Sequence, residues 1–485
     1  MTDWADRVLG CLLGGAVGDA LGFAVEFDTL PQIRERYGPA GLTEMVDAFH
    51  PAGTISDDTQ MTLFTLEGLV RARTALRLGV PVNPLAEVQH AYQRWLHTQD
   101  VPWPQAAGAF LRDHPEPDGW LVTVPELFAL RAPGKTCMGA LKHFAAGHPP
   151  GSPTNRLNNS KGCGGVMRAA PFALWGEDPR VVFRFAMDAA AITHGHPSGF
   201  LAAGALAFLV HQLLRDVPLP EAVDAVLAEL GGWPGHEETV DAMHRALAVA
   251  GQGVPTPEEV EQELGLGWVA EEALAMAVCA ALVAGDDFEL AMQVSINHSG
   301  DSDSVAAICG NLLGAQWGTQ VLPQRWLDRL ELRNVVEQLG LDAIAAFGPN
   351  PPTDPDWLRR YPVGPNRTAA APTEPSAPEA DPDPTTGSPH EPSGPSGRTT
   401  PPPTTAVPTT TGQAPARRPA PEEPTGVEQR LVELWRRFST DPRGLPPAVA
   451  LALHVLGEHL GATPRAPEPP FPAPSPVNLA QRLEG

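Results

Sequence analysis

Two short acidic clusters in this 485-residue sequence could bind a metal ion. The first cluster is Ser56-Asp57-Asp58, and the second is Asp301-Ser302-Asp303-Ser304. Magnesium prefers carboxylate, hydroxyl and water oxygens, so each cluster contains suitable ligands. If the clusters converge, their carboxylates repel one another strongly unless a cation lies between them. The residue types therefore indicate one magnesium site to which both clusters contribute.

Each cluster precedes an apolar segment with helical spacing, which predicts two helices that begin at the acidic residues. Ser56 suits the N-cap of the first helix, and aspartates in a first turn oppose the helix dipole. Capping alone is therefore an alternative interpretation of either cluster taken separately. An EF-hand loop is excluded for the second cluster, because its sixth position is Ala306 rather than glycine and its twelfth is Leu312 rather than glutamate.

A glycine-rich segment near the N-terminus combines a packing pattern with one unexplained carboxylate. Gly14, Gly18 and Gly22 are four residues apart, so on a helix they share one face and allow another backbone to approach closely. Glu26 follows in an otherwise apolar stretch, where a surface role explains it poorly. We predict that Glu26 acts in catalysis, as an acid, a base or a group that orients water.

A second glycine-rich segment, residues 159–168, could present backbone N–H groups to a phosphate. It is not a P-loop, because the order Gly-x4-Gly-Lys-Ser/Thr is absent. Residues 192–197 then place His194 and His196 at the end of a predicted helix. A histidine in such a position can equally be a cap or a core residue.

Taken together and in this order, these segments resemble the ADP-ribosylglycohydrolase family. The resemblance covers residues 5–350, and the matching motifs lie at residues 15–22, 56–60, 131–136, 161–168, 193–197 and 297–304. Each motif alone is unspecific, but six in the right order form a strong signal. The resemblance implies an all-α orthogonal helical bundle that hydrolyses the glycosidic bond between ADP-ribose and an acceptor.

The resemblance also implies a role for particular residues. It implies two magnesium ions, for which manganese can substitute, held by Ser56, Asp57, Asp58, Asp301, Asp303 and Ser304. It implies catalytic roles for Glu26 and Asp58, and contacts to the substrate from Asn159, Ser160, Lys161, Gly162, Gly164 and His194. Some members use a further carboxylate, for which Asp100 is a candidate here. The substrate would be an ADP-ribosylated protein or small molecule. The alternatives are a catalytically silent module that binds ADP-ribose or a nucleotide, and another magnesium-dependent nucleotide hydrolase such as a phosphodiesterase.

Charge and cysteine usage restrict the other classes of function. The formal net charge of -24 opposes binding to a nucleic-acid backbone, and no basic patch stands out. Five scattered cysteines without a CxxC pair favour a reducing compartment rather than a disulfide framework. The first residues do not resemble a signal peptide, and the apolar runs are too short to span a bilayer. These features predict a cytoplasmic protein that does not contact membranes.

Composition divides the chain into four parts. Residues 1–362 are rich in Ala and Leu and lack the alternation typical of strands, which predicts an all-α domain; the resemblance implies that this domain is catalytic. Residues 363–425 are dominated by Pro, Thr and Ala and predict a disordered linker. Residues 426–461 predict a short helical segment that could dock a protein partner, and residues 462–485 are a proline-rich tail.

Overall fold

The computed structural model describes residues 3–364. Most of the predicted linker, the predicted C-terminal helical segment and the proline-rich tail lie outside the described residues. Within residues 3–364 the regular structure is helical, apart from one isolated antiparallel bridge between Gly162 and Val269. The all-α prediction is therefore confirmed. None of the helices in this part of the chain has the length and apolarity needed to cross a membrane.

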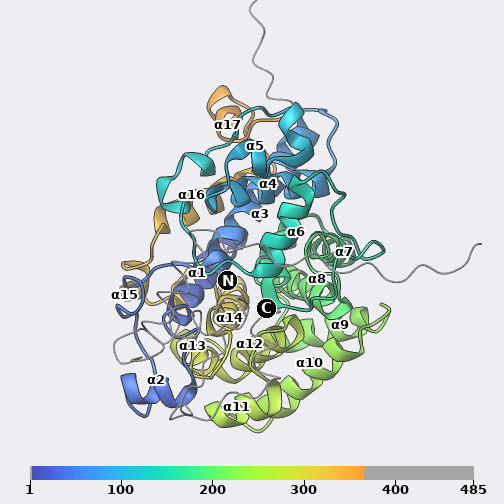
Figure 1. Ribbon diagram of the computed structural model, residues 1–485. Helices are drawn as coiled ribbons and strands as arrows, with labels where there is room; N and C mark the ends of the chain where they lie inside the picture. The colour runs from blue at the N-terminus through green and yellow to red at the C-terminus, as the bar shows by residue number, and fades with distance from the viewer. Residues whose placement is uncertain (1–2, 365–485) are drawn as a thin grey trace, which may run out of the picture. The chain divides into compact units, whose positions relative to one another are not determined.

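The α-helices are numbered in chain order (Figure 1). They are α1 (Trp4–Gly22), α2 (Leu30–Tyr37), α3 (Asp57–Arg77), α4 (Pro84–Thr98), α5 (Trp103–Ala106), α6 (Lys135–Ala145), α7 (Pro179–Ala190), α8 (Pro197–Leu213), α9 (Leu219–Leu230), α10 (Glu237–Ala250), α11 (Pro257–Leu264), α12 (Ala270–Ala284), α13 (Phe288–Ile296), α14 (Ser302–Trp317), α15 (Gln324–Leu327), α16 (Arg333–Phe347) and α17 (Pro355–Arg360). Short 3-10 helices lie at Gly108–Arg112, Leu121–Thr123, Pro125–Leu127, Cys163–Gly165, Ala170–Leu174 and Thr319–Val321.

Local sequence signals begin many of these helices. Asn83 caps α4 by accepting from the N–H groups of Leu85 and Ala86, and Pro84 occupies the first helical position. Thr256 and Glu259 form a reciprocal capping box at the start of α11. These caps satisfy backbone donors that the helix itself leaves without partners, so the helix starts are determined largely by nearby residues.

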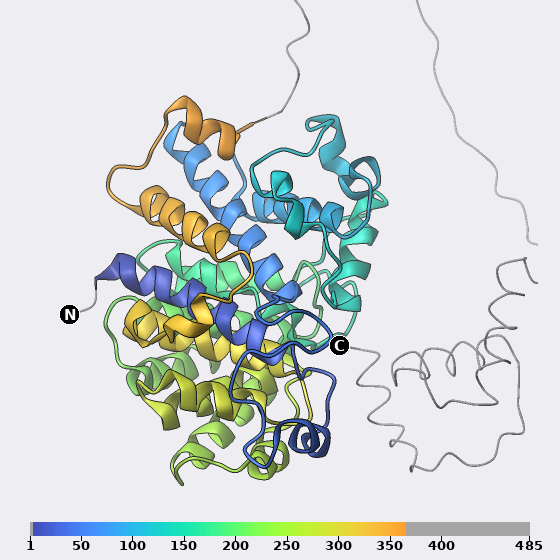
Figure 2. The ribbon, with the colours of Figure 1, turned by 90° about the vertical axis from the view of Figure 1, so that its left-hand side faces the viewer.

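Helices α1 and α14 lie side by side in the middle of the bundle (Figures 1 and 2). A Cβ atom added at Gly14 would lie 2.4 Å from the carbonyl oxygen of Gly310, and one at Gly18 would lie 2.1 Å from that of Ala306. A Cβ atom at Gly22 would lie 2.3 Å from the carbonyl oxygen of Ser302. The prediction that these glycines allow close backbone packing is confirmed. Because the contacts run along both helices, they place the end of α1 against the start of α14.

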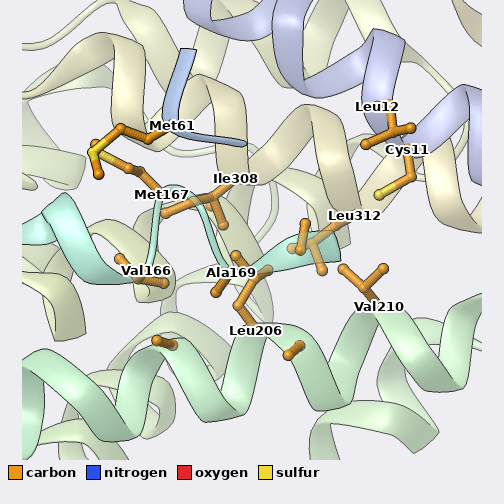
Figure 3. Packing of buried hydrophobic residues seen from close by; sticks show 14 of the residues in the cluster. Cys11, Leu12, Met61, Val166, Met167, Ala169, Leu206, Val210, Ile308 and Leu312 are labelled. Carbon is orange, nitrogen blue, oxygen red and sulfur yellow. The ribbon is translucent and has the colours of Figure 1, made fainter. Parts of the chain in front are cut away.

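The middle of α14 takes part in the hydrophobic core. Figure 3 shows Ile308 and Leu312 of α14 beside Met167 and, on α8, Leu206 and Val210. All five side chains are buried. Packing at this density resists rearrangement, so the first turn of α14 is held in place by the side chains that follow it.

A buried network of ion pairs connects the segment between α4 and α6, residues 99–134, to helices α3 and α4. Arg71 of α3 donates two hydrogen bonds to the carboxylate of Asp118, at 2.7 and 3.2 Å. Arg94 of α4 donates to Glu67 at 2.9 Å, and the ring of His114 lies 3.2 Å from the Asp118 carboxylate. The same segment ends in residues 132–134, which line the candidate site, so the network helps to hold that part of the site in place.

We expect Asp118→Asn to lower the free energy of unfolding by about 3–5 kcal/mol, because removal of one partner leaves buried guanidinium groups poorly compensated. Burial alone would raise the pKa of Asp118, but the hydrogen bond with His114 and the charges of Arg71 and Arg94 hold it below its usual range. A carboxylate with a depressed pKa stabilises the folded state above its unfolded pKa of about 4, and this contribution is lost as the pH falls further.

Urea denaturation of the two proteins near neutral pH and at about pH 3 measures both effects. The difference in unfolding free energy between wild type and Asp118→Asn should shrink at the lower pH. Glu258→Gln is a suitable control, since Glu258 pairs with Arg34 on the surface and its loss should change little. Equal stability of wild type and Asp118→Asn near neutral pH would contradict the structural role of this network.

Candidate metal centre and ligand pocket

The first acidic cluster lies at the N-terminus of α3. Ser56 is the N-cap, and its hydroxyl accepts from the N–H of Asp58 at 3.2 Å. The Asp57 carboxylate accepts from the N–H of Gly134 at 3.3 Å, and both aspartates are buried. One oxygen of Asp58, Oδ2, has no hydrogen-bond partner among the described residues. Capping therefore explains Ser56 but leaves Asp58 without an evident structural role.

The second acidic cluster lies at the N-terminus of α14. Asp301 is the N-cap and accepts from the N–H of Ser304 at 3.4 Å. Asp303 accepts from the same N–H at 2.9 Å, so its carboxylate also takes part in the local turn. The side chains of Asp301, Asp303 and Ser304 are all buried. Both clusters are thus helix starts, where the partial positive charge of the helix favours anionic groups.

The fold brings the two clusters to one cavity of about 180 Å³. Its lining includes five carboxylates, those of Glu26, Asp57, Asp58, Asp301 and Asp303, together with the hydroxyl of Ser304. Carboxylate oxygens of Glu26, Asp301 and Asp303 lie within 4.8 Å of one another. Ser56 is fully buried and is not one of the residues that line this cavity. Among the described residues, Lys135 is the one lysine that lines this cavity, and no arginine lines it, so little positive charge from the protein balances the carboxylates.

The electrostatics of this cavity disfavour a full set of ionised carboxylates. Burial, followed by the charge of Asp303, raises the pKa of Glu26, Asp57 and Asp58 well above their ordinary values. The pKa of Asp301 is raised well above its usual range for the same two reasons, and burial also raises that of Asp303. A divalent cation would compensate this concentration of negative charge.

The donor set fits magnesium. The groups that face one another are carboxylate and hydroxyl oxygens, which are hard ligands. Oδ2 of Asp58 and Oε2 of Glu26 are buried without a hydrogen-bond partner among the described residues, so each retains an oxygen that can accept another contact. The second group of potential ligands, His90, His114 and Asp118, differs because its carboxylate is occupied by Arg71.

Asp19 supports the first cluster, although the sequence analysis assigned it no role. Its carboxylate accepts from the backbone N–H of Ser56 at 2.9 Å and from that of Thr59 at 3.0 Å, and also from the Thr59 hydroxyl. Burial and the charge of Asp303 raise the pKa of Asp19 to about 7, despite these hydrogen bonds. The available sequence signal was one aspartate within the glycine-rich apolar stretch of α1.

The predicted substrate-binding loop lines a larger, neighbouring cavity of about 740 Å³. Asn159, Ser160, Lys161 and Gly162 lie in its lining, whereas Gly164 and His194 line the acidic cavity. Lys135, Thr136 and Trp268 belong to the linings of both cavities. The two cavities therefore adjoin, and together they could hold an extended ligand whose one end reaches the carboxylates.

Two members of the predicted substrate-binding set have partners within the protein. The ammonium of Lys161 lies 2.7 Å from Glu271 and 3.1 Å from Glu238, so its charge is largely compensated. The N–H of Gly162 donates to the hydroxyl of Ser160 at 3.2 Å. The loop thus presents fewer unengaged donors than a phosphate cradle formed from all of its N–H groups would require.

His194 lies at the wall of the acidic cavity and carries no charge near neutral pH. Its ring is buried, and Nδ1 is hydrogen-bonded to the Thr193 hydroxyl at 2.8 Å. Burial and the nearby guanidinium of Arg168 lower its pKa to about 3. Arg168 itself donates to the Thr193 hydroxyl at 2.7 Å, which connects these three side chains in one chain of hydrogen bonds.

Other residues of the cavity were not identified from the sequence, and one candidate lies elsewhere. The Cys163 thiol donates to Oδ2 of Asp301 at 2.7 Å, while Phe27 and Trp268 stack with their ring centroids 6.4 Å apart. Trp268 lies outside all six motifs, so no local signal could have found it. Asp100 is exposed, has a positive φ of 59° and lines neither cavity.

Comparison with known proteins relates residues 1–352 to the ADP-ribosylglycohydrolase family profile. The chain is 24% identical to the ADP-ribosyl-[dinitrogen reductase] glycohydrolase of Rhodospirillum rubrum, over 68% of this chain and 91% of that protein. It is 27% identical to the ADP-ribosylhydrolase ARH3 of Mus musculus, over 36% of this chain and 53% of that protein. A solved ADP-ribosylglycohydrolase-related protein complex is 29% identical and covers 72% of this chain and 98% of its own, with a TM-score of 0.49.

Proposed function

Because the chain belongs to the ADP-ribosylglycohydrolase family, we propose that it hydrolyses the glycosidic bond between ADP-ribose and an acceptor in a magnesium-dependent reaction. The observation that carries this proposal is the meeting of both acidic clusters and Glu26 in one buried cavity. The adjoining cavity of about 740 Å³ offers space for the remainder of an ADP-ribosyl group. Relatives named as hydrolases of ADP-ribosyl linkages support the same reaction.

The proposed metal ligands are the residues of the two helix starts: Ser56, Asp57, Asp58, Asp301, Asp303 and Ser304. Of these, Ser56 contributes through a hydroxyl that also caps α3, and the other five line the cavity. When bound there, two magnesium ions would supply positive charge that engages ribose hydroxyls and lowers the pKa of a bound water.

Glu26 is the proposed residue that positions the attacking water. Its buried Oε2 has no hydrogen-bond partner among the described residues and belongs to a side chain that lines the cavity. This oxygen can accept a hydrogen bond from the water and then receive its proton as the water oxygen bonds to C1 of the ribose. The bond from C1 to the acceptor breaks, its electron pair leaves with the acceptor, and the acceptor takes up a proton from solvent. Neighbouring carboxylates stabilise the positive charge that develops on the sugar.

His194 and the loop of residues 159–164 are proposed to position the rest of the substrate. The neutral imidazole of His194 can hydrogen-bond the substrate without adding positive charge beside the metal ligands. Because Lys161 is paired with Glu271 and Glu238, its proposed contact requires that the ammonium also reach the ligand or leave one of these partners. Asn159 lines the larger cavity and its amide is the proposed contact, whereas the hydroxyl of Ser160 already interacts with Thr136 and with the N–H of Gly162.

We expect Glu26→Gln to lower kcat by about 10²- to 10⁴-fold, the range typical of a lost general base. Glutamine preserves the size of the side chain but cannot accept the proton of the attacking water. Magnesium-dependent thermal stabilisation should persist, because the proposed ligands remain in place. Turnover and melting temperature, measured with and without magnesium, test both parts. Near-normal turnover with unchanged magnesium binding would show that the role assigned to Glu26 is wrong.

The reaction itself is tested by incubating the full chain with a panel of ADP-ribosylated acceptors. Arginine-linked, serine-linked and small-molecule ADP-ribosyl substrates are compared with and without magnesium, and the products are identified by mass. Intact ADP-ribose supports the proposed function. AMP among the products would indicate a phosphodiesterase, and binding of ADP-ribose without cleavage of any substrate would indicate a silent binding module.

A further inference from the structure

Cys163 places a soft ligand atom among the carboxylates of the acidic cavity. Its Sγ lies 2.7 Å from Oδ2 of Asp301, and the side chain lines the same cavity as Asp58 and Ser304. Magnesium has little affinity for sulfur, whereas zinc and cadmium bind thiolate strongly. The role proposed for the oxygen ligands therefore leaves the presence of this thiol unexplained.

The backbone holds Cys163 in this position. Its N–H donates to the carbonyl of Trp268 at 3.3 Å, and its own carbonyl accepts from the N–H groups of Val166 and Met167 at 2.9 and 3.1 Å. The preceding residue, Gly162, forms the isolated bridge to Val269. Because both sides of Cys163 are anchored, the thiol cannot move far from Asp301 without rearrangement of this loop.

Further unsatisfied atoms point to a cation in the same place. Oδ2 of Asp58 is buried and has no hydrogen-bond partner among the described residues, and the same holds for Oε2 of Glu26. Both side chains line the cavity together with Cys163. A cation that contacts Asp301 beside Cys163 therefore finds oxygen ligands available on the other walls.

We propose that Sγ of Cys163 and Oδ2 of Asp301 together bind one thiophilic divalent cation of the zinc and cadmium class, and that this cation displaces magnesium. The displacement rests on the proposed function, which places magnesium on the same carboxylates. Zinc binds sulfur at about 2.3 Å and carboxylate oxygen at about 2.0–2.2 Å, so two atoms in contact can be neighbouring ligands of one ion. The S–H bond breaks as the sulfur–metal bond forms, and the proton is released to solvent without any change of oxidation state.

Cys137 provides a matched control, because it lines the same cavity without sharing this chemistry. Its Sγ lies 3.2 Å from the guanidinium of Arg168, whose positive charge opposes a cation there. The remaining cysteines, Cys11, Cys279 and Cys309, are buried in the hydrophobic core. Among the described thiols, Cys163 is therefore the one placed to bind a metal together with a carboxylate.

Cadmium titration of the full-length protein tests the proposal directly. Thiolate ligation of cadmium produces an ultraviolet charge-transfer absorption, so the readout does not depend on enzymatic activity. We expect about one equivalent of this absorption in wild type and in Cys137→Ser, and its reversal by excess magnesium. In Cys163→Ser the absorption should be absent, and cadmium affinity measured by calorimetry should fall by about tenfold or more.

Three results would overturn the proposal: absorption retained in Cys163→Ser, absorption lost in Cys137→Ser alone, or absorption that excess magnesium cannot reverse. A different result concerns the proposed function. If wild-type protein shows the Cys163-dependent absorption but no stabilisation by magnesium alone, the magnesium centre fails while thiolate ligation by Cys163 is supported. The two proposals can therefore fail separately.

Discussion

Replacement of Asp303 by asparagine is expected to slow hydrolysis severely and to remove the magnesium-dependent rise in melting temperature. Asp303 lines the acidic cavity, and its carboxylate lies within 4.8 Å of those of Glu26 and Asp301. Burial is the largest cause of the raised pKa of Glu26, Asp58 and Asp301, and the charge of Asp303 is the second. Loss of a ligand that also supplies charge at the reacting sugar should lower kcat by about 10³-fold, or about 4 kcal/mol of transition-state stabilisation.

The same substitution should have the opposite effect on the metal-free protein. Asparagine keeps the size of Asp303 and can still accept from the N–H of Ser304, but it removes one of several like charges buried together. We therefore expect the metal-free variant to melt at or above the temperature of metal-free wild type. Only the wild type should then gain stability when magnesium is added, because binding to the folded state alone raises stability.

Thermal denaturation across a magnesium titration, together with turnover of an ADP-ribosylated substrate, measures these effects. Asp286→Asn is the matched control, since Asp286 is exposed at the turn between α12 and α13 and should respond to magnesium as wild type does. If Asp303→Asn kept the full magnesium-dependent shift in melting temperature, the metal ligands would have been assigned to the wrong residues.

Gly22→Ala is expected to damage both the fold and the metal centre, although residue 22 carries no functional group. A Cβ atom at this position would lie 2.3 Å from the carbonyl oxygen of Ser302 and 2.4 Å from the backbone nitrogen of Asp303. These are backbone atoms at the start of α14, so the clash cannot be relieved by moving a flexible side chain. We expect a loss of about 3 kcal/mol in unfolding free energy, at the upper end of typical overpacking costs.

Gly22→Ala should also weaken magnesium binding, because the added Cβ would push the end of α1 away from the second acidic cluster. A displacement of about 1 Å in Asp301 and Asp303 is enough to spoil ligand geometry, so magnesium affinity should fall by about tenfold or more. Gly139→Ala is the control for the loss of a helical glycine, because Gly139 lies in α6 with nothing within 4 Å of the added Cβ. That variant should be more stable by about 0.5–1 kcal/mol.

Denaturant titrations and magnesium binding measured on the two glycine variants separate these expectations. If Gly22→Ala unfolded like wild type and bound magnesium with the same affinity, close packing between α1 and α14 would not be what positions the second cluster. A loss of stability with normal magnesium affinity would show that the helix starts adjust independently of the helix pair.

Much of the fold could be predicted because its signals are local. The spacing of Gly14, Gly18 and Gly22 within one helix indicated a face for close packing before any partner helix was known. Ser56 and Asp301 each stand directly before an apolar helical segment, so both helix starts and their acidic residues were visible in short windows of sequence. An all-α domain and two candidate half-sites follow from such windows, because apolar periodicity and capping residues are both visible within a few turns of sequence.

The tertiary structure decided which of these residues meet. Asp58 and Asp303 share a cavity because the glycines of α1 place its end against the start of α14, while Asp19 of α1 binds the N–H groups of Ser56 and Thr59 at the start of α3. No periodicity encodes these contacts. Only the structure showed that Lys161 forms an ion pair with Glu271 and that the Cys163 thiol donates a hydrogen bond to Asp301. Contacts between residues far apart in the chain depend on side-chain direction and on the packing of whole helices. The sequence therefore determined which candidate ligands are present, and the packing determined that they meet in one cavity.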